Sequence, residues 1–294
     1  MKEKIIRLDN NIFLNYLYSE KNAPTVLFLH FSGGTSHMWN GIFPLFQEHY
    51  QLIAPDFRGH GKSSRPMKGY HIEDMANDIF LLLQQLEIPN CHVIGSSLGA
   101  EVGVCLASKY PDFVLSLTCE GALYNEFGEY GIFNGSIEEI EDEKSKIKLI
   151  LEKRKLNTYS SLEEFISSER AIFDKHGIWN SHVHQFLSSC AERLIDGSYV
   201  SHYKNEVRIE YIQKYWEVKF EEYYKKVVCP VLFMVSEEES NNEKIRNSLT
   251  YFRSLIPLSE INQTKGSIHA YVWMQKPDDA GNVAFKFIQK YYSI

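Results

Sequence analysis

The sequence of 294 residues has no long apolar run and no excess of basic residues. Its apolar stretches all fall well short of the ~18 residues that a membrane span requires. Lys and Arg number 31 against 38 Asp and Glu, so the formal net charge is −7. That charge disfavours nucleic acid and anionic membranes as main partners. We therefore expect neither nucleic-acid binding nor membrane association.

Cysteine is also scarce, and Cys-x-x-Cys spacing is absent. The cysteines are scattered at Cys91, Cys105, Cys119, Cys190 and Cys229. This usage predicts reduced, mostly buried thiols of a cytoplasmic protein. Charged residues interrupt the first positions before any apolar run long enough for a signal peptide, so we expect none. A Gly-x-Gly-x-x-Gly nucleotide loop is missing, and we expect no cofactor. His182 and His184 form His-x-His without nearby carboxylate or Cys ligands, so we expect no metal site.

Apolar and aromatic residues are plentiful by contrast, at 44% and 14% of the chain. A chain of this size can build a substantial core without disulfides or metals. Many of the aromatic residues fall between residues 124 and 224, where we expect most of them to pack against the rest of the fold. The longest basic cluster, Lys144–Lys155, is interleaved with Glu143 and Glu152, which predicts a solvated helix face.

The first 123 residues alternate between strand and helix periodicities. A hairpin is predicted from residues 5–8 and 12–18, which flank the turn signal Asp9-Asn10-Asn11. Further strands are predicted at 25–30, 51–55, 91–95 and 114–119, with helices at 38–48, 71–86 and 98–110. Because the strands are buried runs separated by helices, we predict a mostly parallel sheet covered by helices on both faces.

The alternation stops near Tyr124 and resumes at Pro230. Between these points the pattern is helical, with almost no strand signal, at 137–156, 162–173, 181–195 and 207–224. After Pro230 we predict strands at 231–235 and 258–263, and helices at 243–255 and 278–292. The sequence thus predicts an α/β core of residues 1–123 and 226–294, interrupted by a helical cap (lid) of residues 124–225.

The strongest chemical signal is the pentapeptide Gly95-Ser96-Ser97-Leu98-Gly99. It matches Gly-x-Ser-x-Gly and lies between a predicted buried strand and a helix, where this motif forms a sharp turn. Small residues two positions either side of the serine avoid steric collision. The helix N-terminus offers unpaired N–H groups and a positive dipole end to a developing oxyanion. The pattern predicts Ser97 as a nucleophile.

With this motif the chain resembles the α/β-hydrolase superfamily, in particular its capped branch of esterases, lipases and C–C hydrolases. Residues 28–34 look like the family's His-Gly-x oxyanion loop, and residues 55–63 look like its post-strand signature. The resemblance implies an eight-stranded sheet and an oxyanion hole made by the backbone N–H groups of Ser32 and Leu98. Phe31 departs from the family, which usually has Gly there. Its side chain either crowds the hole or faces the acyl pocket.

Several polar residues in these loops resemble structural groups of the family. His30 and His60 are expected to be structural. Asp56 and Arg58 are expected to form an ion pair that supports the turn.

A serine nucleophile needs a base, because an unassisted hydroxyl barely ionises near neutral pH. The family order is Ser, acid, His, and only His269 follows the last predicted strand. In Ser236-Glu-Glu-Glu-Ser240, Glu239 stands at the family's usual acid position. Some relatives take the acid from the preceding strand end, where this chain has Glu120. We therefore predict Glu239, with Glu120 as the alternative acid; the consecutive glutamates also fit a solvated charge cluster.

Together these features predict a serine hydrolase that cleaves a small or medium apolar carboxylic ester or lactone through an acyl-enzyme intermediate. Ser97 attacks the carbonyl, His269 moves the proton, and a glutamate orients the imidazole. Haloalkane dehalogenases and epoxide hydrolases of this fold need a carboxylate where this chain has Ser97. Two alternatives stay open: a C–C bond hydrolase of diketones, and a hydrolase-like receptor for a small ligand. The sequence does not predict the oligomeric state.

Overall fold

Strands that alternate their side chains between two apolar layers form the centre of the fold. The structure, a computed structural model, describes residues 1–292. In β3 (Thr25–Leu29), Val26 and Phe28 belong to one apolar layer, while Leu27 and Leu29 belong to the other. Every residue of this strand is buried, so helices must cover the sheet on both sides.

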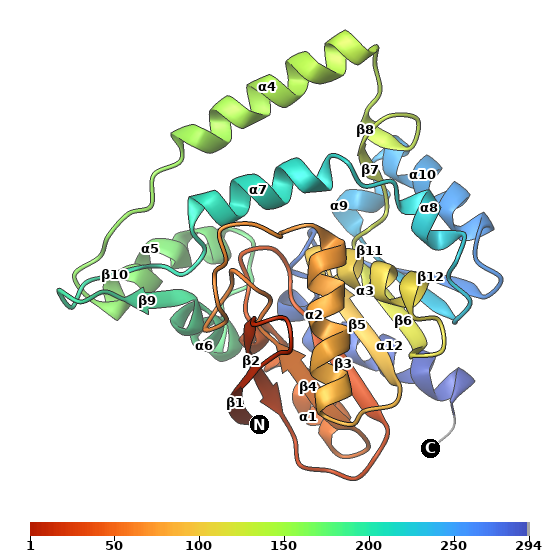
Figure 1. Ribbon diagram of the computed structural model, residues 1–294, viewed down its shortest axis with the longest axis horizontal. Helices are drawn as coiled ribbons and strands as arrows, with labels where there is room; N and C mark the ends of the chain where they lie inside the picture. The colour runs from red at the N-terminus through yellow and green to blue at the C-terminus, as the bar shows by residue number, and fades with distance from the viewer. Residues whose placement is uncertain (293–294) are drawn as a thin grey trace.

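Eight strands make up the central sheet, which Figure 1 shows with helices on either side. Besides β3 they are β1 (Lys2–Arg7), β2 (Phe13–Tyr18), β4 (Gln51–Pro55), β5 (Cys91–Ser96), β6 (Val114–Glu120), β11 (Val231–Ser236) and β12 (Ser259–Thr264). Their order is β1-β2-β4-β3-β5-β6-β11-β12. The pairs β1–β2 and β2–β4 are antiparallel, and the remaining pairs are parallel. The predicted mostly parallel, eight-stranded sheet is confirmed.

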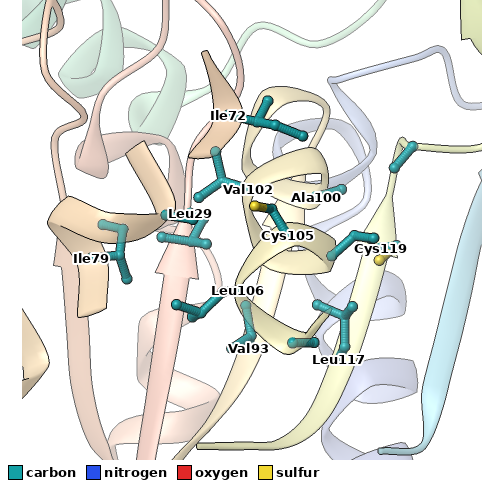
Figure 2. Packing of buried hydrophobic residues seen from close by; sticks show 14 of the residues in the cluster. Leu29, Ile72, Ile79, Val93, Ala100, Val102, Cys105, Leu106, Leu117 and Cys119 are labelled. Atoms are coloured by element: carbon teal, nitrogen blue, oxygen red, sulfur yellow. The ribbon is translucent and has the colours of Figure 1, made fainter. Parts of the chain in front are cut away.

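Two pairs of helices cover the two faces of the sheet. α2 (Ile72–Gln85) and α3 (Leu98–Lys109) belong to one apolar layer, and α1 (Phe43–Gln47) and α12 (Pro277–Tyr291) belong to the other. Figure 2 shows α3 against Leu29, Val93 and Leu117 of three neighbouring strands. A Cβ at Gly103 would lie 2.9 Å from Leu117 Cδ1, so the small residues of α3 permit a close approach to the sheet.

The loop after β4 is held together differently from the prediction. Asp56 accepts hydrogen bonds from the Ser36 N–H at 2.8 Å and from Asn15 Nδ2 at 2.9 Å. Arg58 donates to the carboxylate of Asp78 on α2, from Nε at 2.6 Å and from Nη2 at 2.5 Å. The predicted ion pair between Asp56 and Arg58 is therefore wrong, because Arg58 pairs with Asp78, which is distant in the sequence. His30 is fully buried and accepts the Phe57 N–H at 3.0 Å, which supports the same loop.

The predicted helix over residues 38–48 is broken in two. A 3-10 helix, η1 (Ser36–Trp39), precedes the short α1, whose first turn contains Pro44. Proline lacks an N–H and is tolerated at the start of a helix but not in its interior. The proline therefore separates the two pieces.

The segment between β6 and β11 contains the residues predicted to form the cap. Its elements are β7 (Asn125–Phe127), β8 (Gly131–Phe133), α4 (Ile137–Lys153), α5 (Leu162–Lys175), α6 (Ser181–Cys190), β9 (Ala191–Arg193), β10 (Tyr199–Ser201), α7 (Asn205–Tyr215) and α8 (Phe220–Tyr224). β7, β8 and β10 are additions to the predicted helices, and β9 replaces the end of the helix predicted at 181–195. These strands were missed because three residues carry too little period-2 signal. The division into core and cap stays a prediction.

Three further helices follow β11 in the chain. They are α9 (Glu237–Ser240), α10 (Glu243–Ser254) and α11 (Val272–Gln275). Figure 1 shows α4 and α7 on the side of the sheet where β11 ends and α9 begins. Within residues 1–292, none of the helices is both long and apolar enough to cross a membrane.

Candidate active site

Ser97 lies in a tight turn between β5 and α3. Its φ is +50°, in a region that residues other than glycine rarely adopt. A Cβ at Gly95 would lie 2.4 Å from the Gly99 carbonyl oxygen, and a Cβ at Gly99 would lie 2.0 Å from the Leu29 carbonyl oxygen. Only glycine fits at these two positions. The Ser97 N–H donates to the Glu120 carbonyl at 2.5 Å, which ties the turn to β6.

The loop between β12 and α11 brings His269 to this serine. His269 Nε2 lies 3.1 Å from Ser97 Oγ, within hydrogen-bond reach. Glu237 also holds this loop, because its carboxylate accepts the Gly266 N–H at 2.7 Å. The His269 side chain is 34% exposed, so the imidazole borders open space.

Glu239 approaches the other imidazole nitrogen from α9. The Ser236 N–H donates to Glu239 Oε2 at 3.1 Å, and the Glu239 N–H donates to Ser236 Oγ at 3.2 Å. This reciprocal pair is a capping box. It holds Oε2, and Oε1 lies 2.8 Å from His269 Nδ1. The Ser-x-x-Glu spacing is visible in the sequence and would have distinguished Glu239 from its two neighbours.

Glu120 is the second carboxylate near this histidine. It ends β6 in register with Ser96 and is fully buried. Ser96 Oγ donates to its Oε2, and the Ala270 N–H donates to its Oε1 at 2.7 Å. Glu120 Oε1 lies 3.9 Å from His269 Nδ1. The structure therefore brings both candidate acids to His269, with Glu239 nearer and Glu120 bonded elsewhere.

The run Glu237-Glu238-Glu239 is not a simple solvated cluster. Glu239 is 4% exposed and Glu237 is half-buried against Gly266, so only Glu238 is exposed. Glu238 also accepts the His269 N–H, at 3.4 Å, so all three glutamates contact the histidine or its loop.

Burial and neighbouring charges shift the pKa values of His269, Glu239 and Glu120 in different directions. Burial lowers the pKa of His269, but the contact with Glu239 and the charges of Glu239, Glu120 and Glu101 raise it to about 9. Burial raises the pKa of Glu239, yet His269 and Ser236 hold that pKa below its ordinary value. Burial, opposed by the charge of His269, raises the pKa of Glu120 to about 7. At neutral pH an imidazolium therefore faces the carboxylate of Glu239.

Glu120, Glu239 and His269 also offer donor atoms of the types that bind divalent metals. Their ligand atoms lie within 4.8 Å of one another, the one such group in the part of the chain that the structure describes. These atoms already contact each other or the Ser96 and Ala270 donors. His182 and His184 do not belong to a group of this kind.

One predicted oxyanion-hole residue, Leu98, follows the serine in the chain, and the other, Ser32, lines the same cavity as Ser97. Leu98 is the first residue of α3, so its N–H has no acceptor within the helix. Ser32 lines the cavity that contains Ser97, and its Oγ lies 2.7 Å from the Tyr203 hydroxyl. Phe31 lines the same cavity and packs its ring against Phe186, with ring centroids 5.6 Å apart. Of the two predicted orientations of Phe31, the structure favours the one that faces the pocket.

A cavity of about 1000 Å³ has Ser97 and His269 in its wall. Most of the lining residues are aromatic or aliphatic, including Phe31, Leu123, Tyr124, Ile150, Leu151, Phe165, Phe173, Phe186, Tyr203, Ile212, Tyr215, Trp216 and Tyr271. Charged side chains are also present, namely Glu101, Glu126, Arg154, Lys155, Glu169 and Arg208. The aromatic wall matches the composition of the predicted cap, whereas none of these charged residues was predicted at the site.

Glu101 is the most buried of these charged residues. It lies in the first turn of α3, is 5% exposed, and accepts the Tyr211 hydroxyl at 3.1 and 3.0 Å from its two oxygens. Burial, opposed by this hydrogen bond, raises the pKa of Glu101 to about 8. The hint in the sequence was an acidic residue on a helix otherwise made of small and apolar residues.

Comparisons with known proteins place this fold among hydrolases. The family described as alpha/beta hydrolase fold matches residues 24–239. The 3-oxoadipate enol-lactonase 2 of Acinetobacter baylyi is 34% identical over 103 residues, which are 35% of this chain and 39% of that protein. The 2-(acetamidomethylene)succinate hydrolase of Mesorhizobium japonicum is 36% identical over 96 residues, 33% of this chain and 34% of that protein. The chain thus spans about a third of the length of these curated relatives.

Similarity to solved structures extends over nearly the whole chain. The crystal structure of E-2-(acetamidomethylene)succinate hydrolase matches with a TM-score of 0.77 at 20% identity and covers 98% of both chains. The enol-lactonase from Burkholderia xenovorans matches with a TM-score of 0.70 at 15% identity, over 97% of this chain and 99% of that one. At such identities the similarity shows the fold alone.

Proposed function

The chain belongs to the alpha/beta hydrolase fold family, and on this premise we propose that it is a serine hydrolase with Ser97, His269 and Glu239 as its catalytic triad. One observation carries the proposal: Ser97 Oγ lies 3.1 Å from His269 Nε2, and His269 Nδ1 lies 2.8 Å from Glu239 Oε1. A serine, a base and an acid in this order can activate the hydroxyl for attack.

In the proposed reaction, neutral His269 accepts the Ser97 proton at Nε2 while Oγ bonds to the carbonyl carbon of an ester. The Ser32 and Leu98 N–H groups donate to the resulting oxyanion, each worth about 2.7–4 kcal/mol in the transition state. The imidazolium then gives its proton to the departing alkoxide, which leaves an acyl-enzyme. Water then attacks the acyl carbon while His269 takes its proton. The bond from the carbon to Ser97 Oγ breaks, His269 returns the proton to Oγ, and the acid leaves.

The proposed substrate is a small or medium carboxylic ester or lactone. A cavity of about 1000 Å³ lies at the upper end of the sizes common for small-molecule sites. Its aromatic and aliphatic walls suit the apolar part of such a substrate. An enol-lactonase among the relatives supports the lactone option.

We also propose that the cap of residues 124–225 acts as a lid, because its residues Arg208, Tyr211 and Tyr215 share the cavity wall with Ser97. A cytoplasmic location is supported by the five cysteines, which are all free and buried.

The test combines a fluorophosphonate probe with a series of p-nitrophenyl esters of increasing acyl length. We expect the probe to label the protein at Ser97, the Ser97→Ala variant to stay unlabelled, and at least one short or medium ester to be hydrolysed. Labelling without turnover of any ester would instead support the C–C hydrolase. A protein that is neither labelled nor active would contradict the proposed function and support a receptor.

The pH dependence of the reaction follows from the pKa of His269. Because this pKa is raised from 6.5 to about 9, most of the imidazole is protonated at neutral pH and cannot accept the serine proton. We expect kcat/KM for p-nitrophenyl butyrate to rise with pH, with a midpoint well above 6.5. Glu101→Gln removes one of the charges that raise this pKa, so the midpoint should move to lower pH. A midpoint at or below 6.5 in the unmodified protein would contradict the expectation.

A further inference from the structure

Two arginines in the wall of the cavity form no ion pair with the residues that the structure describes. Arg154 caps the end of α4, and Arg208 lies in α7. Within residues 1–292, neither guanidinium makes a side-chain hydrogen bond or an ion pair within 4.0 Å. The Nη1 atom of Arg154 is completely buried and still has no hydrogen-bond partner. A buried polar group without a partner costs free energy, and each guanidinium offers five donors.

The two guanidinium groups also act on each other. The end of α4 meets the start of α7, where Asn205 Nδ2 donates to the Leu151 carbonyl at 3.0 Å, and both arginines line the cavity. Burial lowers the pKa of Arg154, and the charge of Arg208 lowers it further. Two like charges that face one cavity repel each other, and a bound anion would relieve this repulsion.

The acidic residues of the cavity do not neutralise this pair. The carboxylate of Glu101 is bonded to Tyr211. Burial raises the pKa of Glu169, and the charge of Arg154 lowers it. Even so, the Glu169 and Glu126 carboxylates form no ion pair within 4.0 Å in the described part of the chain.

Tyr203 connects the arginines to the reaction centre. Its hydroxyl lies 2.7 Å from Ser32 Oγ, and Ser32 is a proposed oxyanion-hole residue. Burial raises the pKa of Tyr203 to about 12, against the opposing hydrogen bond of Ser32 and the charges of Arg208 and Arg154. Tyr203, the two arginines and Ser97 all line the same cavity.

We propose that Arg154 and Arg208 form an anion subsite for a carboxylate at the end of the substrate remote from the scissile ester. A guanidinium fork matches the two oxygens of a carboxylate. The wall of the cavity also includes Leu151, Ile212 and Tyr203, whose apolar surfaces suit an aliphatic chain. The proposal rests on the proposed function and names its substrate class: half-esters of dicarboxylic acids, or lactones that bear a carboxylate. It replaces a wholly apolar substrate with an amphipathic one.

The kinetic test compares two esters that differ only in charge at the far end. These are the mono-p-nitrophenyl ester of adipic acid and its methyl ester at the free carboxyl. We expect kcat/KM to be about 10-fold or more higher for the anionic ester, the range of a charge-assisted hydrogen bond. In Arg154→Gln and Arg208→Gln this ratio should fall about 10-fold. Arg154→Lys should restore part of it, because the positive charge remains.

The matched control is Lys153→Gln, which removes the same charge from an exposed neighbour outside the cavity wall. Its ratio should equal that of the unmodified protein, which separates a local contact from a general effect of net charge. An equal ratio in the arginine variants and the unmodified protein would overturn the proposal while leaving the proposed function intact.

A binding measurement makes the proposal testable without turnover. Titration calorimetry with adipate and with dimethyl adipate, on the Ser97→Ala variant, should detect binding of adipate only. Adding Arg154→Gln or Arg208→Gln should weaken it about 10-fold or more. If no ester is hydrolysed but adipate binds through these arginines, the proposed function fails and the anion subsite stands. Equal or absent binding of both compounds would overturn the subsite.

Discussion

Replacing Ser97 with Ala is expected to lower kcat for p-nitrophenyl butyrate by on the order of 10⁶-fold, and His269→Ala should cause a similar loss. Ser97 supplies the atom that bonds to the acyl carbon. His269 Nε2 lies 3.1 Å from Ser97 Oγ and accepts the hydroxyl proton, so His269→Ala removes the base. Initial rates at saturating ester, measured at the pH optimum, would test both variants. His49→Ala replaces an exposed histidine outside the cavity wall and should keep full activity.

The double variant Ser97→Ala/His269→Ala gives a sharper result. Triad members act as a unit, so the double variant should be no less active than either single one. Losses that multiply would mean that the two residues act in separate steps. If Ser97→Ala keeps activity within about tenfold of the unmodified protein, another group is the nucleophile.

Much of the fold could be predicted because its signals are local. β5 was predicted at 91–95 and α3 at 98–110, each within one residue of the structure, since buried strands and helices repeat their apolar pattern over short distances. The broken helix before β4 and the three-residue strands escaped prediction. The position of Pro44 decides where the helix breaks, and the short strands form because a partner strand is available, so periodicity predicts neither.

Some residues of the site could be predicted from local sequence signals, whereas others depend on contacts between distant parts of the chain. Ser97 stands in a pentapeptide whose spacing reflects steric collisions within the turn, and His269 follows from chain order; the structure brings their side chains together. Glu120 and Glu239 could not be separated in advance, because β6 and β11 are neighbours and both strands end near the imidazole. Arg154 was assigned to a solvated helix face. Its position in the cavity depends on how the end of α4 meets α7.

Replacing Glu239 with Gln is expected to lower kcat by about 10⁴-fold, because the wrong imidazole tautomer is then favoured. The Ser236 N–H and hydroxyl both donate to Glu239 Oε2. A glutamine would keep its carbonyl oxygen in this capping box, which accepts Gln as readily as Glu. Its NH₂ group would then face His269 Nδ1. That nitrogen would have to accept, which places the proton on Nε2, where Ser97 needs a lone pair.

Glu120→Gln is the matched comparison, since it removes the other carboxylate near the same imidazole. Glu120 accepts from Ser96 on one oxygen and from Ala270 on the other, and it lies 3.9 Å from Nδ1, so it is not placed to set the tautomer. We expect a loss in kcat of about tenfold or less and a lower pH midpoint, because one charge that raises the pKa of His269 is gone. A large loss in Glu120→Gln with a small one in Glu239→Gln would make Glu120 the acid. Equal, mild losses would mean that neither glutamate orients His269.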